Sequence, residues 1–94
     1  MASHYLEAAK EWSKDRIREE IADIRAEIEQ FRREALEIRS KTDDEVAEIN
    51  SGNHPRSNED DPYKHTDLAY ESASNLDSLA ERYQNDIEFL KSLL

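Results

Sequence analysis

The sequence predicts an all-α protein, a long helical hairpin of two helices whose first helix carries a coiled-coil heptad seam. Three observations predict this fold. Apolar residues in the first half recur at alternating steps of four and three, the single Gly and both Pro lie between residues 52 and 62, and the rest is rich in helix-favouring residues. We expect residues 1–94 to form a single helical domain, because 94 residues allow only one of ordinary size.

The charge of the chain disfavours some classes of binding partner. The net charge is −10, and residues 42–94 hold only four Lys or Arg against thirteen Asp or Glu. Such an acidic balance disfavours nucleic acids and anionic membrane surfaces as direct partners, since both bind cationic side chains. There is no Cys for disulfides, no membrane-spanning apolar run and no export leader, so a cytoplasmic location is the expectation.

The first helix is expected from about residue 3 to about residue 50. Ser3 can cap its start, and neither Gly nor Pro interrupts the run that follows. One competing signal lies inside the run, because residues 42–45, Thr-Asp-Asp-Glu, match the capping box that often opens a new helix. A break or kink near residue 41 therefore stays open.

The heptad seam of this helix predicts association with another helix. Its members are Ile17, Ile21, Ile24, Ile28, Phe31, Ala35 and Ile38. Flanking rows of opposite charge are Arg18, Arg25, Arg32 and Arg39 on one side, and Glu20, Glu27 and Glu34 on the other. In a parallel pair of copies each of these glutamates faces an arginine of the second copy, whereas an antiparallel pair opposes like charges. The pattern favours parallel self-association.

The number of copies follows less directly from the sequence. Ile at both kinds of core position favours trimers or tetramers, whereas Phe31, Ala35 and the flanking Lys14 and Thr42 disturb that rule, so a dimer is our prediction. A second helix folding back converts a parallel pair into a homodimeric four-helix bundle. In the alternative, a monomeric hairpin, the seam simply meets the second helix of its own chain.

Residues 51–61 are expected to form a loop, because Gly52 suits the left-handed position that ends a helix and Pro55 cannot continue one. Asp61-Pro62 reads as an N-cap followed by a first helical residue, so the second helix is expected over about 62–94. Its packing residues, at spacings that drift towards an eleven-residue period, are Leu76, Leu79, Tyr83, Ile87, Leu90 and Leu94.

The N-terminal segment offers candidate partner-binding residues. A second helix of this length ends near residue 18 of the first, which leaves Tyr5, Leu6 and Trp12 projecting. Exposed aromatic residues often anchor protein partners. The alternative is a structural role, in which Trp12 packs over Leu93 and Leu94.

The sequence offers no chemistry beyond binding. His4, His54 and His65 are too widely spaced for a metal site, and residues 50–61 lack the ligand pattern of a calcium loop. We find no nucleophile motif or glycine-rich phosphate loop, so we expect neither an enzyme nor a bound cofactor.

Two functions are therefore expected. The first is a non-enzymatic protein–protein interaction module that self-associates through the coiled coil and works as an adaptor or structural component for an unidentified protein. The alternative is a small acidic inhibitor that mimics nucleic acid and blocks a basic groove on its target, as viral anti-defence proteins do. Its candidate carboxylates are Asp43, Asp44, Glu45, Glu48, Glu59, Asp60, Asp61, Asp67 and Glu71. High salt should weaken the inhibitor's complex far more than the adaptor's.

Overall fold

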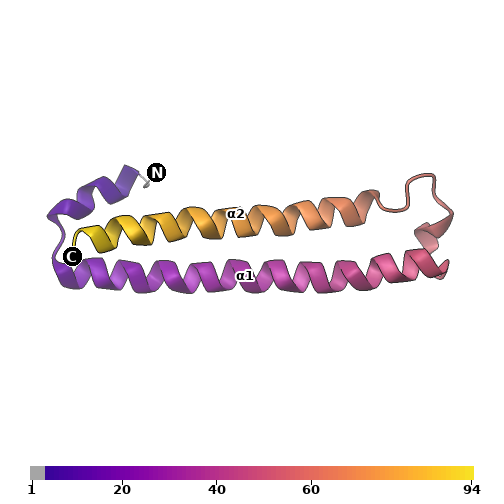
Figure 1. Cartoon of the computed structure of the whole chain (residues 1–94), viewed down its shortest axis with the longest axis horizontal. Coiled ribbons are helices and arrows are strands. Elements are labelled where there is room, and N and C mark those ends of the chain that lie inside the picture. Colours follow the sequence, from indigo (N-terminus) through magenta and orange to yellow (C-terminus); the bar gives the residue numbers. More distant parts are fainter. Residues whose placement is uncertain (1–3) are drawn as a thin grey trace.

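The protein is a two-helix hairpin. The computed structural model describes the backbone of residues 4–94 and the side chains from Leu6 onward. Helix α1 spans Lys14–Ser51 and helix α2 spans Lys64–Ser92, and they pack side by side and antiparallel (Figure 1). There are also two short 3₁₀ helices. Helix η1 (His4–Glu11) precedes α1, and helix η2 (Pro55–Asn58) lies in the loop between α1 and α2. The predicted all-α hairpin is confirmed.

The molecule is a rod whose length is that of α1. At ~1.5 Å per residue, the 38 residues of α1 extend about 57 Å. The described chain measures 60 × 18 × 14 Å, so α1 runs from end to end. Its radius of gyration is 19.2 Å, whereas a compact domain of this size has a radius of about 12 Å. Each helix therefore keeps much of its surface in contact with water.

The predicted single helix over residues 3–50 is instead two helices with a turn between them. Ser13 has extended backbone angles (φ −64°, ψ 156°), and its hydroxyl accepts a hydrogen bond from the Arg16 N–H at 3.2 Å. Ser13 is thus the N-cap of α1, with Asp15 favourably placed in the first turn. The residue predicted as the cap, Ser3, lies outside the described residues.

No break occurs near residue 41, where the sequence left one open. Helix α1 continues through the Thr-Asp-Asp-Glu segment. The Thr42 hydroxyl donates to the Ile38 carbonyl one turn earlier, at 2.5 Å, and the side chain is buried. Thr42 therefore satisfies its hydroxyl inside a continuous helix instead of capping a new one.

Helix α1 ends at Gly52, as predicted. Gly52 adopts φ 81°, and the N–H groups of Gly52 and Asn53 donate to the Ile49 and Glu48 carbonyls at 3.1 Å. This left-handed ending suits glycine because it has no Cβ. The loop then returns to α1, where the Ser57 hydroxyl donates to the Ile49 carbonyl at 3.0 Å.

Helix α2 begins two residues later than predicted. Its N-cap residue is Tyr63 rather than Asp61, so Pro62 precedes the helix. The Tyr63 carbonyl accepts from the Asp67 N–H and the Thr66 hydroxyl, both at 2.8 Å, and the Tyr63 hydroxyl bonds Asn50 of α1. Tyr63, the residue at which α2 begins, is thus also in contact with α1.

Candidate functional site

The helix pair buries one continuous row of side chains, which we call the inner row. Within the described residues, every member of this row is buried except Leu94 at the C-terminus. Its members are Ile21, Ile28, Ala35, Thr42 and Ile49 on α1, and Thr66, Ala73, Ala80, Ile87 and Leu94 on α2. Both sets recur every seven residues, so α2 continues a heptad and does not drift towards the predicted eleven-residue period. Alanines in this row let the helices approach closely.

A second row, the outer row, lies beside the inner row and changes its burial along the rod. It comprises Ile17, Ile24, Phe31, Ile38 and Glu45 on α1, and Ala69, Leu76, Tyr83 and Leu90 on α2. Ile17, Ile24 and Leu90, at the end near the C-terminus, are 2%, 4% and 0% exposed. All the other members are only half-buried. The outer row is therefore buried at one end of the hairpin and partly exposed to water along the rest.

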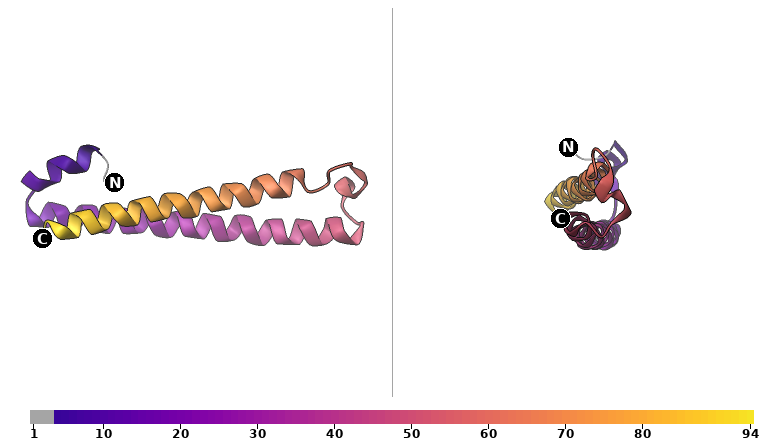
Figure 2. Two further views of the ribbon diagram at one scale, coloured as in Figure 1. Left: turned by 45° about the horizontal axis from the view of Figure 1, so that its top comes forward. Right: turned by 90° about the vertical axis from the view of Figure 1, so that its right-hand side faces the viewer.

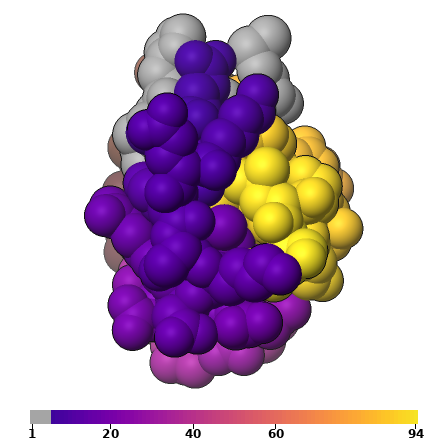
Figure 3. Space-filling view, turned by 90° about the vertical axis from the view of Figure 1, so that its left-hand side faces the viewer, coloured from indigo at the N-terminus to yellow at the C-terminus, as the bar shows by residue number. Residues whose placement is uncertain are grey.

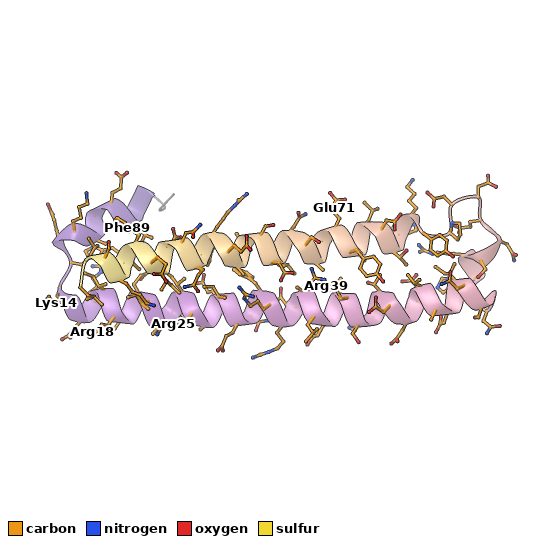
Figure 4. All side chains as sticks on the ribbon, in the orientation of Figure 1. Lys14, Arg18, Arg25, Arg39, Glu71 and Phe89 are labelled. Atoms are coloured by element: carbon orange, nitrogen blue, oxygen red, sulfur yellow. The ribbon has the colours of Figure 1, made fainter. Side chains whose placement is uncertain are left out.

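Helix η1 lies at the end of the hairpin where the outer row is buried. Leu6 and Ala9 are completely buried and belong to one apolar core with Ile17, Ile24 and Leu90. Figures 1 and 2 show η1 alongside α2 only near the end that holds the C-terminus. Seen from that end, η1 packs against the last turns of α2 (Figure 3), and Phe89, labelled beneath η1 in Figure 4, also packs against this core.

The candidate anchors near the N-terminus thus lie against the chain itself. Leu6 is buried in the core, and Trp12 is half-buried against it. The guanidinium carbon of Arg16 lies 4.2 Å from the centre of the Trp12 ring, a cation–π contact. The Tyr5 side chain lies outside the described residues. In this conformation the burial of Leu6 and Trp12 fits the structural role left open by the sequence.

Beyond η1, half-buried apolar side chains form what we call the apolar strip. It consists of Phe31, Ile38, Leu76, Leu79 and Tyr83. The Phe31 and Tyr83 rings meet edge to face, with centroids 5.3 Å apart. Leu79 lies on the far side of the outer row by helical geometry, and exposed Leu68 (53%) lies on the same side of α2.

The opposite side of the helix pair carries a charged contact. Arg39 Nη2 lies 2.7 Å from Asp77 Oδ2, and Figure 4 shows Arg39 directed at α2. By helical geometry the inner row lies between this ion pair and the outer row. Leu36, 68% exposed on α1, lies on the side of the ion pair. The two sides of the hairpin therefore differ, one charged and one with an apolar strip.

The two edges of the apolar strip differ in charge. Along α1, the exposed residues next to the outer row are Glu27, Gln30, Glu34, Glu37, Lys41, Asp44 and Glu48. Along α2, they are His65, Leu68, Ser72, Asn75 and Arg82. The α1 edge thus carries five carboxylates against one ammonium group, whereas the α2 edge carries no carboxylate among these positions. A partner lying on the strip meets negative charge on one side only.

The charged residues predicted to pair between copies differ in the contacts that they make within the hairpin. Arg39 pairs with Asp77, and Arg18 pairs within its own helix with Asp15 at 3.1 Å. Arg25 and Arg32 are exposed and form no ion pair with any described residue. Glu27 and Glu34 are also exposed, and Glu34 accepts a hydrogen bond from Gln30 at 2.9 Å.

The predicted packing residues of α2 separate into three groups. Ile87 and Leu90 are fully buried, Leu76, Leu79 and Tyr83 belong to the half-buried strip, and Leu94 is 46% exposed. Sequence reasoning missed the buried Thr66 and Ala80, and the predicted packing residues did not include Ala73; all three side chains carry little apolar signal. Together with Ile87 and the outer-row residues of α2, they recur at alternating steps of three and four from Thr66 to Leu90, and this pattern was the signal that could have found them.

The carboxylates considered for nucleic-acid mimicry gather at the loop end of the rod. They come from the last turns of α1, the loop and the first turns of α2 (Figure 1). Two are engaged locally. Asp43 accepts a hydrogen bond from the Tyr70 hydroxyl at 2.5 Å, and Glu45 Oε1 lies 3.4 Å from His54 Nε2.

The described residues, 4–94, show neither a pocket nor a metal-binding group. They bring no three His, Asp or Glu side chains together in an arrangement that could hold a metal ion. None of their helices has an apolar stretch long enough to cross a bilayer. In comparisons with protein-family models, curated proteins and solved structures, none matches this chain.

Proposed function

We propose that this chain is a non-enzymatic protein–protein interaction module, an adaptor or structural component that docks a partner on its apolar strip. The half-buried outer row beyond η1 carries this proposal. Phe31, Ile38, Leu76 and Tyr83 occupy core positions of the helix pair, yet they retain contact with water. Burial of apolar surface of this kind drives protein association.

Photo-crosslinking in cells that make the protein tests the docking side. A photoreactive amino acid replaces Leu76 on the strip or, in the matched control, Leu36 on the charged side. We expect a defined crosslinked protein from position 76 and none from position 36. Equal adducts from both positions, or none from either, would contradict docking on the strip.

Self-association is one way in which such a module can work. The structure describes a single chain in which the seam residues Ile17, Ile21, Ile24 and Ile28 are buried in its own core, whereas Ile38 is half-buried. The parallel coiled-coil dimer therefore stays a prediction, and it requires the hairpin to open or to stack on a second hairpin. Arg25 and Arg32 favour it, because they are exposed, form no ion pair with a described residue, and face glutamates in a parallel pair.

Light scattering coupled to size exclusion decides this point. A dimer that is weakened when Arg25 and Arg32 are both changed to Glu supports parallel pairing. A monomer at micromolar concentration rules out self-association as the working state and leaves docking of a different protein.

A second candidate function is the acidic inhibitor. The gathering of carboxylates at the loop end favours it, since closely spaced negative charges can occupy a nucleic-acid groove. Salt separates the two candidates. Raising salt weakens an inhibitor's complex steeply, whereas it changes a complex held by the apolar strip only mildly.

A further inference from the structure

The geometry points to the occupant of the apolar strip: an amphipathic helix of another protein, lying in line with η1 and carrying lysines or arginines along one edge. This inference rests on the proposed function and specifies its partner. It follows from three features of the structure, which are the intramolecular contact made by η1, the unequal charge of the strip's edges, and the obstacles to a second copy.

Helix η1 shows what kind of element covers the outer row. It is a helix of this chain that contacts α2 and whose Leu6 and Ala9 are buried in the same apolar core as the outer-row residues Ile17, Ile24 and Leu90. By helical geometry the apolar strip continues the outer row from this core towards the loop. From Phe31 to Glu45 the open part of the row is about 21 Å long, which matches a helix of about 14 residues. A second helix can therefore lie where η1 stops.

The charge of the partner follows from the edges. A helix on the strip has its two flanks over the edges formed by α1 and α2. The α1 edge presents Glu27, Glu34, Glu37, Asp44 and Glu48 with only Lys41 to offset them. The exposed positions of the α2 edge carry no carboxylate, and Asp86, which continues the row of His65 and Ser72, is buried. A helix with cations on the flank nearest α1 is therefore attracted, and one with carboxylates there is repelled.

A second copy of this chain fits the strip poorly in either direction. When two hairpins stack with α1 against α2 of the other copy, both η1 helices lie at the same end of the pair, where we expect each to crowd the other copy. When they stack with α1 against α1, the two acidic edges meet. The first arrangement is opposed by steric overlap and the second by charge repulsion.

Three synthetic peptides of about 18 residues test this inference with the full chain. The basic peptide has a leucine and alanine seam with lysines along one flank. The acidic peptide has glutamates in place of those lysines, and the third peptide has serines in place of the leucines. Affinity is measured by fluorescence anisotropy of labelled peptide.

We expect the basic peptide to bind at least about tenfold more tightly than the acidic one, the combined effect of several edge charges. The serine peptide should not bind. Changing Glu34 and Glu37 to Lys should abolish most of the preference for the basic peptide. Equal binding of the acidic and basic peptides would overturn the inference.

Variants of the chain identify the surface used. Leu79→Lys on the strip should raise the Kd of the basic peptide by about tenfold, as expected for loss of a buried apolar contact. Leu36→Lys on the charged side should leave the Kd of the same peptide unchanged. Leu68→Lys, at an exposed position beside the strip, should also weaken binding and cannot act by unfolding the core. Equal effects of Leu36→Lys and Leu79→Lys would contradict docking on the strip.

The outcomes separate this inference from the proposed function. Crosslinks from position 76 together with no binding of the basic peptide would overturn the basic helix and leave the interaction module. A dimer of the unliganded chain that Leu79→Lys dissociates would identify a second copy as the occupant and would equally overturn the inference.

Discussion

At Ser13 the hydroxyl accepts a hydrogen bond from the Arg16 N–H, and this bond lets α1 begin where the chain turns. Ser13→Ala removes the acceptor, so the free energy of unfolding should fall by about 1 kcal/mol. Urea denaturation measures this change in the free energy of unfolding. The matched control is Ser40→Ala, at an exposed position inside α1, where alanine should be neutral or stabilising by about 0.5 kcal/mol. Equal losses in both variants would show that Ser13 is not acting as a cap.

Tyr70 and Asp43 link the two helices near the loop end. The hydrogen bond to Asp43 is the main cause that raises the pKa of Tyr70 above its ordinary 10.0, with desolvation and the negative charges of Asp43 and Asp67 adding to it. The fold thus favours the protonated phenol. Stability from this contact should be complete below pH 10.0 and lost as the pH rises through the higher folded-state pKa.

Absorbance of tyrosinate as a function of pH tests this expectation. The difference between the parent protein and Tyr70→Phe isolates the titration of Tyr70, which should have a pKa above 10.0. In Asp43→Asn the pKa should move back towards that value, because the main acceptor charge is gone. A Tyr70 that titrates at or below 10.0 in the folded parent would contradict the contact.

At the scale of elements, η1 decides which isoleucines meet water. Ala9 of η1 is fully buried, whereas its neighbour Ala8 is exposed. Ala9→Glu places a charge in the core and should release η1, lowering the free energy of unfolding by about 3 kcal/mol. Ile17 and Ile24 are then uncovered, so the average mass in light scattering should rise. Ala8→Glu is the control and should leave both quantities unchanged.

An unchanged mass in Ala9→Glu despite lowered stability would show that the uncovered isoleucines do not pair with other copies. That result would also weigh against the parallel coiled coil, which needs the same side chains. Equal stability of the Ala8 and Ala9 variants would instead place η1 away from the core.

How far the elements could be predicted depends on how each one is encoded. Gly52 ends α1 through local geometry, and the heptad from Ile17 to Ile38 predicts a helix, so both could be found in the sequence. The turn at Ser13 could not be separated from a continuing helix, because serine is common in both settings and the choice depends on the burial of Leu6. The open side of the outer row also depends on where η1 lies in space.

Over the whole molecule, large apolar side chains and small or polar ones are unevenly distributed. The apolar core includes Ile17, Ile24, Ile87 and Leu90 at the η1 end. Towards the loop, the inner row is made largely of Ala and Thr, and the helices are joined there by polar contacts such as Tyr70 to Asp43. Because larger apolar side chains are buried at the first end, we expect the free energy that opposes local opening to be greater there.

Hydrogen exchange measured by mass spectrometry tests this difference along the rod. Amides of residues 17–28 and 80–90, which meet in the apolar core, should exchange most slowly. Amides of residues 38–49 and 66–76 should exchange faster, although they lie in equally regular helix, because the loop-end half can open while the η1 end stays packed. Ile49→Ala should accelerate exchange in the loop-end half alone, whereas Ile87→Ala should accelerate it throughout. Uniform protection along both helices would mean that the hairpin opens only as a whole, and that the apolar strip presents a rigid surface to its partner from end to end.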